Sequence, residues 1–219
     1  MPARSTWRGS LAIAGLSIPV RAFNSIDRSP DIELHQYHTL CGGPIRQSRY
    51  CPKHGSVETS EISLGYEYSS EQVLLLSEEE LASISPTDSK EIDITCFVTA
   101  DAIPCVYLNG KHLYVVPDGT AAQRPYAAIL KSLQITGKVG VSKMVMYQRE
   151  QIVSVRPYGR LLCISILEYA EKVRCAADYE SEVEHVDLSD EELLLSKQLV
   201  DVLTMSDLSL DSFCDPRTA

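Results

Sequence analysis

The chain has 219 residues, of which 44% are hydrophobic, and it carries a formal net charge of −10. This length and composition supply a sizeable core and exclude a mainly disordered chain. No apolar run approaches the roughly 18 residues that cross a bilayer. Seven cysteines, an odd number, are not typical of a secreted disulfide framework. We therefore expect a globular protein of the cytoplasm.

Short segments rich in β-branched or aromatic residues recur along the chain, separated by Gly, Pro, Asn or Asp, and they predict strands. In chain order they are 9–23, 32–38, 91–98, 112–118, 140–148, 151–157 and 161–169. Asn109-Gly110 stands between two apolar runs and predicts a hairpin turn, because both residues tolerate positive φ. The pattern predicts a mainly β fold, an antiparallel sheet or a barrel, with few helices.

Three helices are predicted from their end signals. Segment 77–84 begins with the capping-box pair Ser77 and Glu80, and segment 189–206 begins with the same pattern. Segment 124–137 has Pro125 at its first turn and Gly137 at its end. The polar, acidic stretch between 171 and 189 predicts an arm or linker, so the last helix is expected to pack weakly or against a partner.

The charges are distributed unevenly. Residues 175–219 carry 12 acids and two bases, so residues 1–174 are neutral. Within that part, 58–101 holds 11 acids and one base, while 103–174 holds 10 bases and four acids. Such segregation creates a positive and a negative side if the fold keeps the two stretches apart. Ordinary solvated surface charge is the alternative.

Residues 38–54 predict a metal site. His38-x-x-Cys41 and Cys51-x-x-His54 are two ligand pairs separated by nine residues, the spacing with which a zinc knuckle wraps a tetrahedral ion. Four protein ligands close the coordination shell, so the zinc would be structural. The alternative is a set of free cysteines near surface histidines. His35 is a possible substitute for His38.

Catalytic motifs are absent from the sequence. There is no phosphate-binding Gly-x-x-x-x-Gly-Lys-Ser/Thr loop, no Gly-x-Ser-x-Gly elbow and no Gly-x-Gly-x-x-Gly fingerprint. Cys96 and Cys163 lie in apolar runs and are expected in the core. His112 and His185 are expected to be structural or solvent-facing. We therefore do not expect an enzyme.

Several segments, in this order, resemble the prokaryotic Ku family over about residues 5–205. They are "WRGSLAIAGLSIPVRAFNSI", "HQYHTLCGGPIRQSRYCPKHG", "LGYEY", "HLYVVPDGTAAQRPYAAILKSL" and "GKVGVSKMVMYQREQIVSVRPYGRLL". The resemblance implies a β-barrel core and a homodimer whose intertwined arms close a ring around duplex DNA. It also implies a nucleoid-associated role in double-strand break repair and recombination: binding DNA ends in non-homologous end joining and recruiting an ATP-dependent DNA ligase.

The sequence departs from the family pattern at two places. Members with the metal motif usually end it in Cys-x-x-Cys, whereas His54 is the last candidate ligand here. Family chains also continue beyond the last predicted helix, whereas this one ends at Ala219, so we expect either a truncated sequence or a short form of the protein. The expected domains are a Ku-like barrel core over 1–174, with the zinc-knuckle insert at 38–54, and an acidic arm with a helix over 175–219.

In the ring picture, phosphate contacts hold the DNA without reading its bases, because cations displace counterions from the duplex. The basic stretch 103–174 and the knuckle are expected to face the hole, with the acidic stretch 58–101 and the tail outside. The candidate DNA contacts are Arg46, Arg49, Lys53, Arg124, Lys138, Lys143, Arg149 and Arg156. A second hypothesis is a zinc-ribbon protein or metal-dependent nuclease that binds nucleic acid without encircling it.

Overall fold

The computed structural model describes residues 4–27, 34–69, 72–84, 89–210 and 213. The chain divides into two compact units, one formed by residues 1–27 and 34–170 and the other by 171–219 with 28–33. The sequence had placed the boundary at 174. Within the described part of the chain, no helix has both the length and the apolar character needed to span a bilayer.

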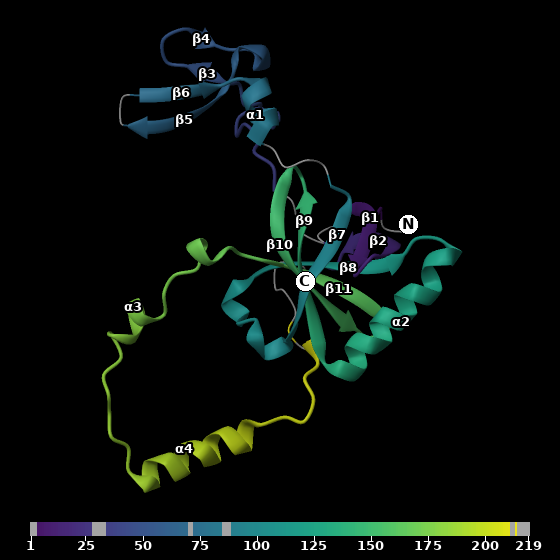
Figure 1. The fold of residues 1–219 in the computed structure, drawn as a ribbon. Helices are drawn as coiled ribbons and strands as arrows, with labels where there is room; N and C mark the ends of the chain where they lie inside the picture. The colour runs from purple at the N-terminus through teal and green to yellow at the C-terminus, as the bar shows by residue number, and fades with distance from the viewer. Residues whose placement is uncertain (1–3, 28–33, 70–71, 85–88, 211–212, 214–219) are drawn as a thin grey trace. The chain divides into compact units, whose positions relative to one another are not determined.

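The first unit is built on a closed seven-stranded barrel, as the mainly β prediction required (Figure 1). Its neighbours run in the order β1-β2-β8-β11-β10-β9-β7, and a parallel pairing of β1 with β7 closes the ring of strands. All other pairings in the barrel are antiparallel. The strands are β1 (Trp7–Ile13), β2 (Leu16–Asn24), β7 (Glu91–Thr99), β8 (Leu108–Pro117), β9 (Lys138–Met146), β10 (Arg149–Tyr158) and β11 (Leu161–Leu167).

Alternate residues of these strands fill the barrel interior. Ile18 and Val20 of β2 are fully buried, and Val153 and Val155 of β10 contribute in the same alternating way. Burying such a side chain stabilises the fold by about 1.5–3 kcal/mol relative to leaving it in water. Cys163 is buried as expected, but Cys96 is exposed, because the β7–β9 register shifts between Ile94 and Cys96. The prediction for Cys96 was therefore wrong.

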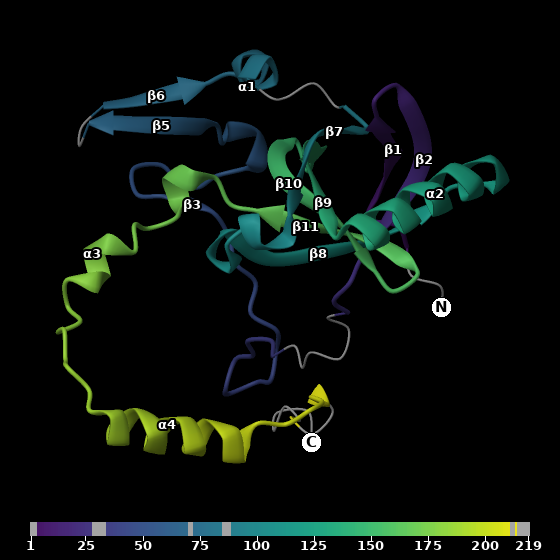
Figure 2. The same cartoon turned by 60° about the horizontal axis from the view of Figure 1, so that its bottom comes forward.

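Helix α2 (Thr120–Thr136) lies against the barrel (Figure 2) and packs on β2, β8, β9 and β10. It contributes Ala122, Tyr126 and Leu133 to the core. It ends at Gly137, which adopts the left-handed conformation, as predicted. Its start was predicted wrongly. The helix begins four residues before Arg124, so Pro125 lies inside it and not in its first turn.

The first predicted strand, 9–23, is in fact a hairpin. Ala14 and Gly15 both have positive φ, +48° and +86°, and join β1 to β2 in a tight turn. Two positive values at the central residues match the right-handed twist of the flanking strands. The chain reverses at this point because Gly15 takes that conformation without steric cost.

The predicted turn at Asn109-Gly110 does not reverse the chain. Both residues lie within β8, where the pairing with β11 shifts between Ser165 and Leu167. The side-chain oxygen of Asn109 accepts from the backbone N–H of Lys111 at 3.0 Å, which satisfies the backbone locally. The residues directly before β8 form a short 3₁₀ helix, Cys105–Tyr107. They therefore do not supply the first strand of a hairpin at Asn109-Gly110.

The barrel is interrupted between β2 and β7 by a separate set of small elements. They are β3 (Tyr50–Cys51), β4 (Gly55–Ser56), a 3₁₀ turn (Thr59–Glu61), β5 (Leu64–Ser69), β6 (Gln72–Leu76) and α1 (Glu78–Ile84). Helix α1 begins with the predicted capping box, in which Ser77 and Glu80 exchange hydrogen bonds. Segment 32–38 was predicted as a strand; residues 32–33 lie outside the described residues, and for 34–38 the prediction was wrong. Within these described residues, strand-like pairing is confined to the bridge between Tyr37 and Pro44.

The second unit contains α3 (Ala177–Glu180) and α4 (Asp190–Leu203), preceded by a 3₁₀ turn at Ala170–Lys172. Helix α4 starts at the predicted capping box, because the backbone N–H of Glu192 donates to Ser189 Oγ and its carboxylate accepts from the backbone N–H of Ser189. No side chain of α4 is buried within the chain. The expectation that the last helix packs weakly or against a partner stays a prediction.

Candidate nucleic-acid interface and metal centre

The first candidate ligand pair lies in a tight local turn. The backbone N–H of Gly42 donates to the carbonyl of His38, and the N–H of His38 donates to the carbonyl of Gly43, both at 2.8 Å. Gly42 has a φ of +65°, which a side chain would strain. The turn leaves His38 Nδ1 3.1 Å from Cys41 Sγ.

The second pair repeats this arrangement. Cys51 in β3 pairs with Gly55 in β4, and Gly55 has a φ of +85°. Two residues separate Cys51 from His54, and the turn that they form leaves Cys51 Sγ 3.5 Å from His54 Nδ1. Each half of the motif is therefore a turn that brings one sulfur and one imidazole nitrogen together and is followed by a glycine with positive φ.

Donor type and spacing within each pair fit zinc. With Zn–S near 2.3 Å and Zn–N near 2.0–2.1 Å, tetrahedral angles place the two donor atoms about 3.5 Å apart. The Cys51–His54 separation of 3.5 Å matches this value, and the His38–Cys41 separation of 3.1 Å is about 0.4 Å shorter. Across the described ranges, however, no three His, Cys, Asp or Glu side chains gather into one metal-binding group. The four-ligand zinc site therefore stays a prediction, and His35 stays a possible substitute.

The three candidate cations of the insert lie in and beside the loop that joins the two pairs. Arg46 and Arg49 are exposed between Cys41 and Cys51, and Lys53 is exposed within the second turn. The backbone holds the loop's far end, because the N–H of Val57 donates to the carbonyl of Arg49 at 3.0 Å. The local turns that position the metal donors therefore also present these cations to solvent.

The candidate cations of the barrel occupy different environments. Arg124 is exposed on α2, Lys138 is exposed at the first position of β9, and Arg149 is exposed at the first position of β10. The turn before Arg149 is strained, because Tyr147 and Gln148 have φ values of +54° and +58°. Exposed cations of this kind are available to phosphates without prior rearrangement.

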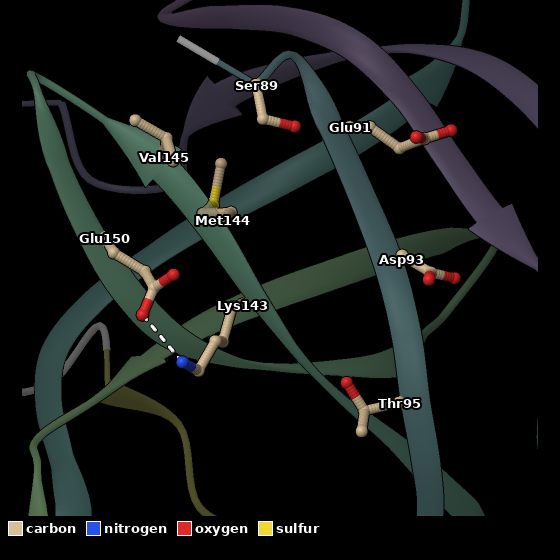
Figure 3. Close-up of a pocket in the computed structure, with 8 residues that line it drawn as sticks. All are labelled: Ser89, Glu91, Asp93, Thr95, Lys143, Met144, Val145 and Glu150. Carbon is tan, nitrogen blue, oxygen red and sulfur yellow. Dashed lines mark hydrogen bonds and ion pairs between the residues drawn. The ribbon is translucent and has the colours of Figure 1, made fainter. Parts of the chain in front are cut away.

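Lys143 is already paired. Its Nζ lies 2.7 Å from Glu150 Oε1, and this hydrogen bond, together with the charge of Glu150, raises the pKa of Lys143. Figure 3 shows the two side chains pointing toward each other in a shallow pocket that is also lined by Glu91 and Asp93. The local balance of charge in this pocket is negative, which is unfavourable for a phosphate.

The same pocket corrects the expected segregation of charge. Strand β7 belongs to the acidic stretch 58–101 and β9 to the basic stretch 103–174, yet the two strands pair directly. Asp93 and Lys143 therefore line one pocket and do not lie on separate sides. Segregation along the chain was lost here because strand pairing joins residues that are far apart in sequence.

Arg156 is half-buried on the outer face of β10. Its Nη2 donates to Ser154 Oγ at 3.4 Å, and its Nε is buried without a hydrogen-bond partner. Arg156 stands opposite Cys163 in the neighbouring strand β11. Burial raises the pKa of the Cys163 thiol, and the nearby Arg156 charge opposes that rise. The sheet thus restricts this guanidinium more than the other candidates.

Two further cations were missed by the sequence reasoning. Arg8 of β1 and Arg21 of β2 stand directly opposite each other, and both contact Asp118. The signal was present in the chain. Once 9–23 is recognised as part of a hairpin turning at Ala14-Gly15, counting outward from the turn pairs the two arginines.

The fold and the site define a β-barrel protein with an insert between β2 and β7 that carries two turns, each holding one His and one Cys. Residues 12–195 match the family model described as the Ku70/Ku80 beta-barrel domain of Ku. That match spans well over half of the sequence, and the chain belongs to the Ku family.

Relatives with the name "Non-homologous end joining protein Ku" come from archaea and bacteria. The Archaeoglobus fulgidus protein is 29% identical over 213 residues, which are 97% of this chain and 83% of the relative. The Heliobacterium modesticaldum protein is 28% identical over 205 residues, covering 93% and 73% of the two chains. The Bacillus subtilis protein is 27% identical over 200 residues, covering 90% and 63%.

Proposed function

We propose that this protein binds the ends of double-stranded DNA, without sequence preference, as a homodimeric ring that acts in double-strand break repair by non-homologous end joining. The observation that carries the proposal is the match of residues 12–195 to the Ku beta-barrel model, on a chain whose structure is a closed barrel. The relatives named as end-joining proteins support the same function.

A chain of net charge −10 can hold DNA if the cations lie where the duplex passes. Phosphate neutralisation and counterion release depend on local lysine and arginine, not on the sum over the molecule. Arg46, Arg49, Lys53, Lys138 and Arg149 are exposed and supply such cations. Arg124, Lys143 and Arg156 complete the proposed set of contacts, with Lys143 and Arg156 contributing less because other groups already engage them.

Homodimer formation is supported by apolar surface that a single chain leaves open. The hairpin β5–β6 exposes Tyr66 and Leu74, which are direct cross-strand partners and are 64% and 54% exposed. In α4, Leu195 and Leu199 are exposed as well. An isolated two-stranded hairpin is marginally stable in water, so a partner that covers its apolar side chains would stabilise it.

The proposed metal is one structural zinc ion per chain, held by His38, Cys41, Cys51 and His54. When bound, the zinc would cross-link two turns that the chain already forms and would fix the loop bearing Arg46. Small inserts of this kind bury little apolar surface, so a metal can supply much of their folding free energy.

Ligase recruitment completes the proposal. End joining requires a phosphodiester bond to be formed, and binding a DNA end does not by itself form that bond. A ring on each DNA end would therefore hold an ATP-dependent DNA ligase near the break. The ring would raise the local concentration of the ligase at the ends without taking part in the reaction.

The test compares linear and covalently closed circular DNA of one sequence. A threading ring binds the linear duplex and leaves the closed circle free in a gel shift, and linearising the circle restores binding. Equal affinity for both forms would overturn encirclement. Strand cleavage after addition of a divalent metal would favour the nuclease hypothesis. An increased rate of blunt-end joining by an ATP-dependent ligase, seen only with the protein present, is the expected result for recruitment.

A further inference from the structure

We propose that Arg8, Arg21 and Asp118 form a built site for a backbone phosphate of DNA, outside the set of contacts named above. The inference rests on the proposed function, because it assigns a further part of the DNA-binding surface. The three residues come from three separate parts of the first unit: β1, β2 and the segment between β8 and α2.

One carboxylate contacts both guanidinium groups. Asp118 Oδ2 accepts a hydrogen bond from Arg8 Nε at 2.6 Å. Its other oxygen, Oδ1, lies 3.2 Å from Arg21 Nε as an ion pair without hydrogen-bond geometry. In the described part of the chain, neither arginine donates a hydrogen bond through an Nη nitrogen. These nitrogens carry the donors that grip a phosphate in parallel hydrogen bonds.

The arrangement is costly without a further anion. Arg8 and Arg21 are direct cross-strand partners, and like charges in this position repel each other. Asp118 compensates one of the two charges, so the cluster keeps a net charge of +1. A phosphate of charge −1 would balance the cluster and use the donors that Asp118 leaves free. The unbalanced charge therefore points to an anionic ligand.

The cluster is held in place before any ligand binds. The backbone N–H of Asp118 donates to the carbonyl of Pro19 in β2 at 2.9 Å, which fixes the carboxylate beside the two strands. The guanidinium of Arg21 lies 5.9 Å from the centre of the Phe23 ring, within the range of a cation–π contact. The side chain of Asp118 is only 19% exposed, whereas that of Arg8 is 71% exposed and that of Arg21 42%. The fixed partner is thus sheltered while the arginines face solvent.

DNA is the occupant that these observations favour. A duplex presents one negative charge for about every 1.7 Å of its axis, so a +1 cluster on an otherwise acidic chain gains from contact with it. The competing occupant is the acidic segment 178–192 of a second copy, whose carboxylates could also pair with arginine. The two occupants differ in what they change: the first alters DNA affinity, and the second alters self-association.

The experiment replaces each arginine by glutamine, as Arg8→Gln and Arg21→Gln, in the full chain. The matched control is Arg160→Gln, an exposed arginine in the turn between β10 and β11. That turn lies by the far part of α2, because Gln134 Nε2 donates to the carbonyl of Gly159 at 2.8 Å. Among the described residues, no hydrogen bond or ion pair joins Arg160 to Arg8, Arg21 or Asp118.

Binding is measured on a short blunt linear duplex at several salt concentrations. We expect Arg8→Gln and Arg21→Gln each to weaken binding about three- to tenfold near physiological salt, and to lower the salt slope by about one unit per lost phosphate contact. Arg160→Gln should match the wild type. Arg8→Lys, which keeps the charge but not the planar fork, should recover part of the affinity.

Equal affinity and salt slope for the two variants and the control would overturn the site. So would a fall in the solution mass of the free protein with DNA affinity unchanged, since that result assigns the arginines to a second copy. Failure of the wild type to bind the linear duplex would instead overturn the proposed function. Arg8 is mostly exposed, so Arg8→Gln tests the site even if Arg21→Gln fails to fold, and thermal melting checks both variants.

Discussion

The hydroxyl of Tyr126 accepts a hydrogen bond from the backbone N–H of Leu162 at 2.7 Å and donates to the carbonyl of Val115 at 2.6 Å. Leu162 and Val115 are direct partners in the pairing of β11 with β8. The side chain of an α2 residue therefore stands in place of one rung of the β-ladder. This contact fastens the helix to the barrel by two buried hydrogen bonds.

Removing this hydroxyl should destabilise the protein without changing its packing. Tyr126→Phe leaves the N–H of Leu162 and the carbonyl of Val115 without their partner in a buried place, which costs about 1–3 kcal/mol of the free energy of unfolding. Urea denaturation followed by circular dichroism measures the loss. Tyr147→Phe is the control, because Tyr147 is 71% exposed, and its change should stay within about 0.5 kcal/mol. Equal midpoints for both variants would contradict the role of the hydroxyl.

The barrel itself could be predicted in outline because its strands follow local patterns. Alternation and β-branched residues correctly placed β7, β9, β10 and β11, and the capping signals correctly started α1 and α4. These features depend on residues a few positions apart, so local sequence patterns are enough to predict them. Closure of the barrel by the parallel pairing of β1 with β7 depends on residues about eighty positions apart and carries no local signal.

Two errors share one physical cause: a turn signal was weighed without its flanking strands. Asn109-Gly110 had favourable turn residues but lacked a preceding strand, so it became an irregularity inside β8. Ala14-Gly15 was treated as part of one continuous strand, although the strands on both sides fold it into a hairpin with positive φ at both residues. Because this hairpin was not predicted, the cross-strand pairing of Arg8 with Arg21 was not predicted either.

The candidate site also has parts that the sequence could predict and parts that it could not. The two ligand pairs were predictable, because each depends on a turn of a few residues, and the structure brings Cys51 and His54 together as the spacing implied. The state of the cations was not predictable. Whether Lys143 is free depends on Glu150, which reaches it only because β9 and β10 pair in one particular register.

The buried thiol of Cys163 should be slow to react and should link stability to pH. Its pKa is raised by burial, so the folded state keeps the proton at pH values where the unfolded chain loses it. The stabilising effect is complete below the ordinary thiol pKa and is lost as the pH rises above it. Alkylation followed by mass spectrometry should label the exposed Cys105 and Cys175 first and Cys163 only after unfolding. Equal labelling rates in the folded protein would contradict this assignment.

Two neighbouring cations should contribute differently to DNA binding. Arg149 is exposed, whereas the ammonium group of Lys143 is bonded to Glu150 in an acidic pocket. We expect Arg149→Gln to weaken binding to a linear duplex and to lower the salt slope by about one unit, and Lys143→Gln to change the slope by clearly less. The comparison uses one duplex at several salt concentrations. A larger effect for Lys143→Gln would show that the ion pair opens to bind phosphate.

Self-association should depend on the exposed apolar face of the β5–β6 hairpin. Leu74→Asp puts a charge opposite Tyr66 on that face, where desolvating it against a second copy would cost several kcal/mol. Analytical ultracentrifugation should show a shift from dimer to monomer. Glu67→Ser, on the other face of the same hairpin, is the control and should leave the mass unchanged. A dimeric Leu74→Asp variant would place the interface elsewhere.

The zinc prediction can be tested without DNA. Purified protein should contain about one zinc ion per chain, and Cys51→Ser should abolish it, because three remaining ligands with a serine hydroxyl hold zinc far more weakly. Cys105→Ser is the matched control, since Cys105 is an exposed cysteine distant in sequence from both ligand pairs. Chelation of the wild type should increase hydrogen exchange in residues 38–57, whose turns the metal would cross-link, while the barrel strands keep their protection. Full zinc content in Cys51→Ser would move the metal to other residues, and an unchanged exchange pattern after chelation would show that the two turns hold their shape through backbone hydrogen bonds alone.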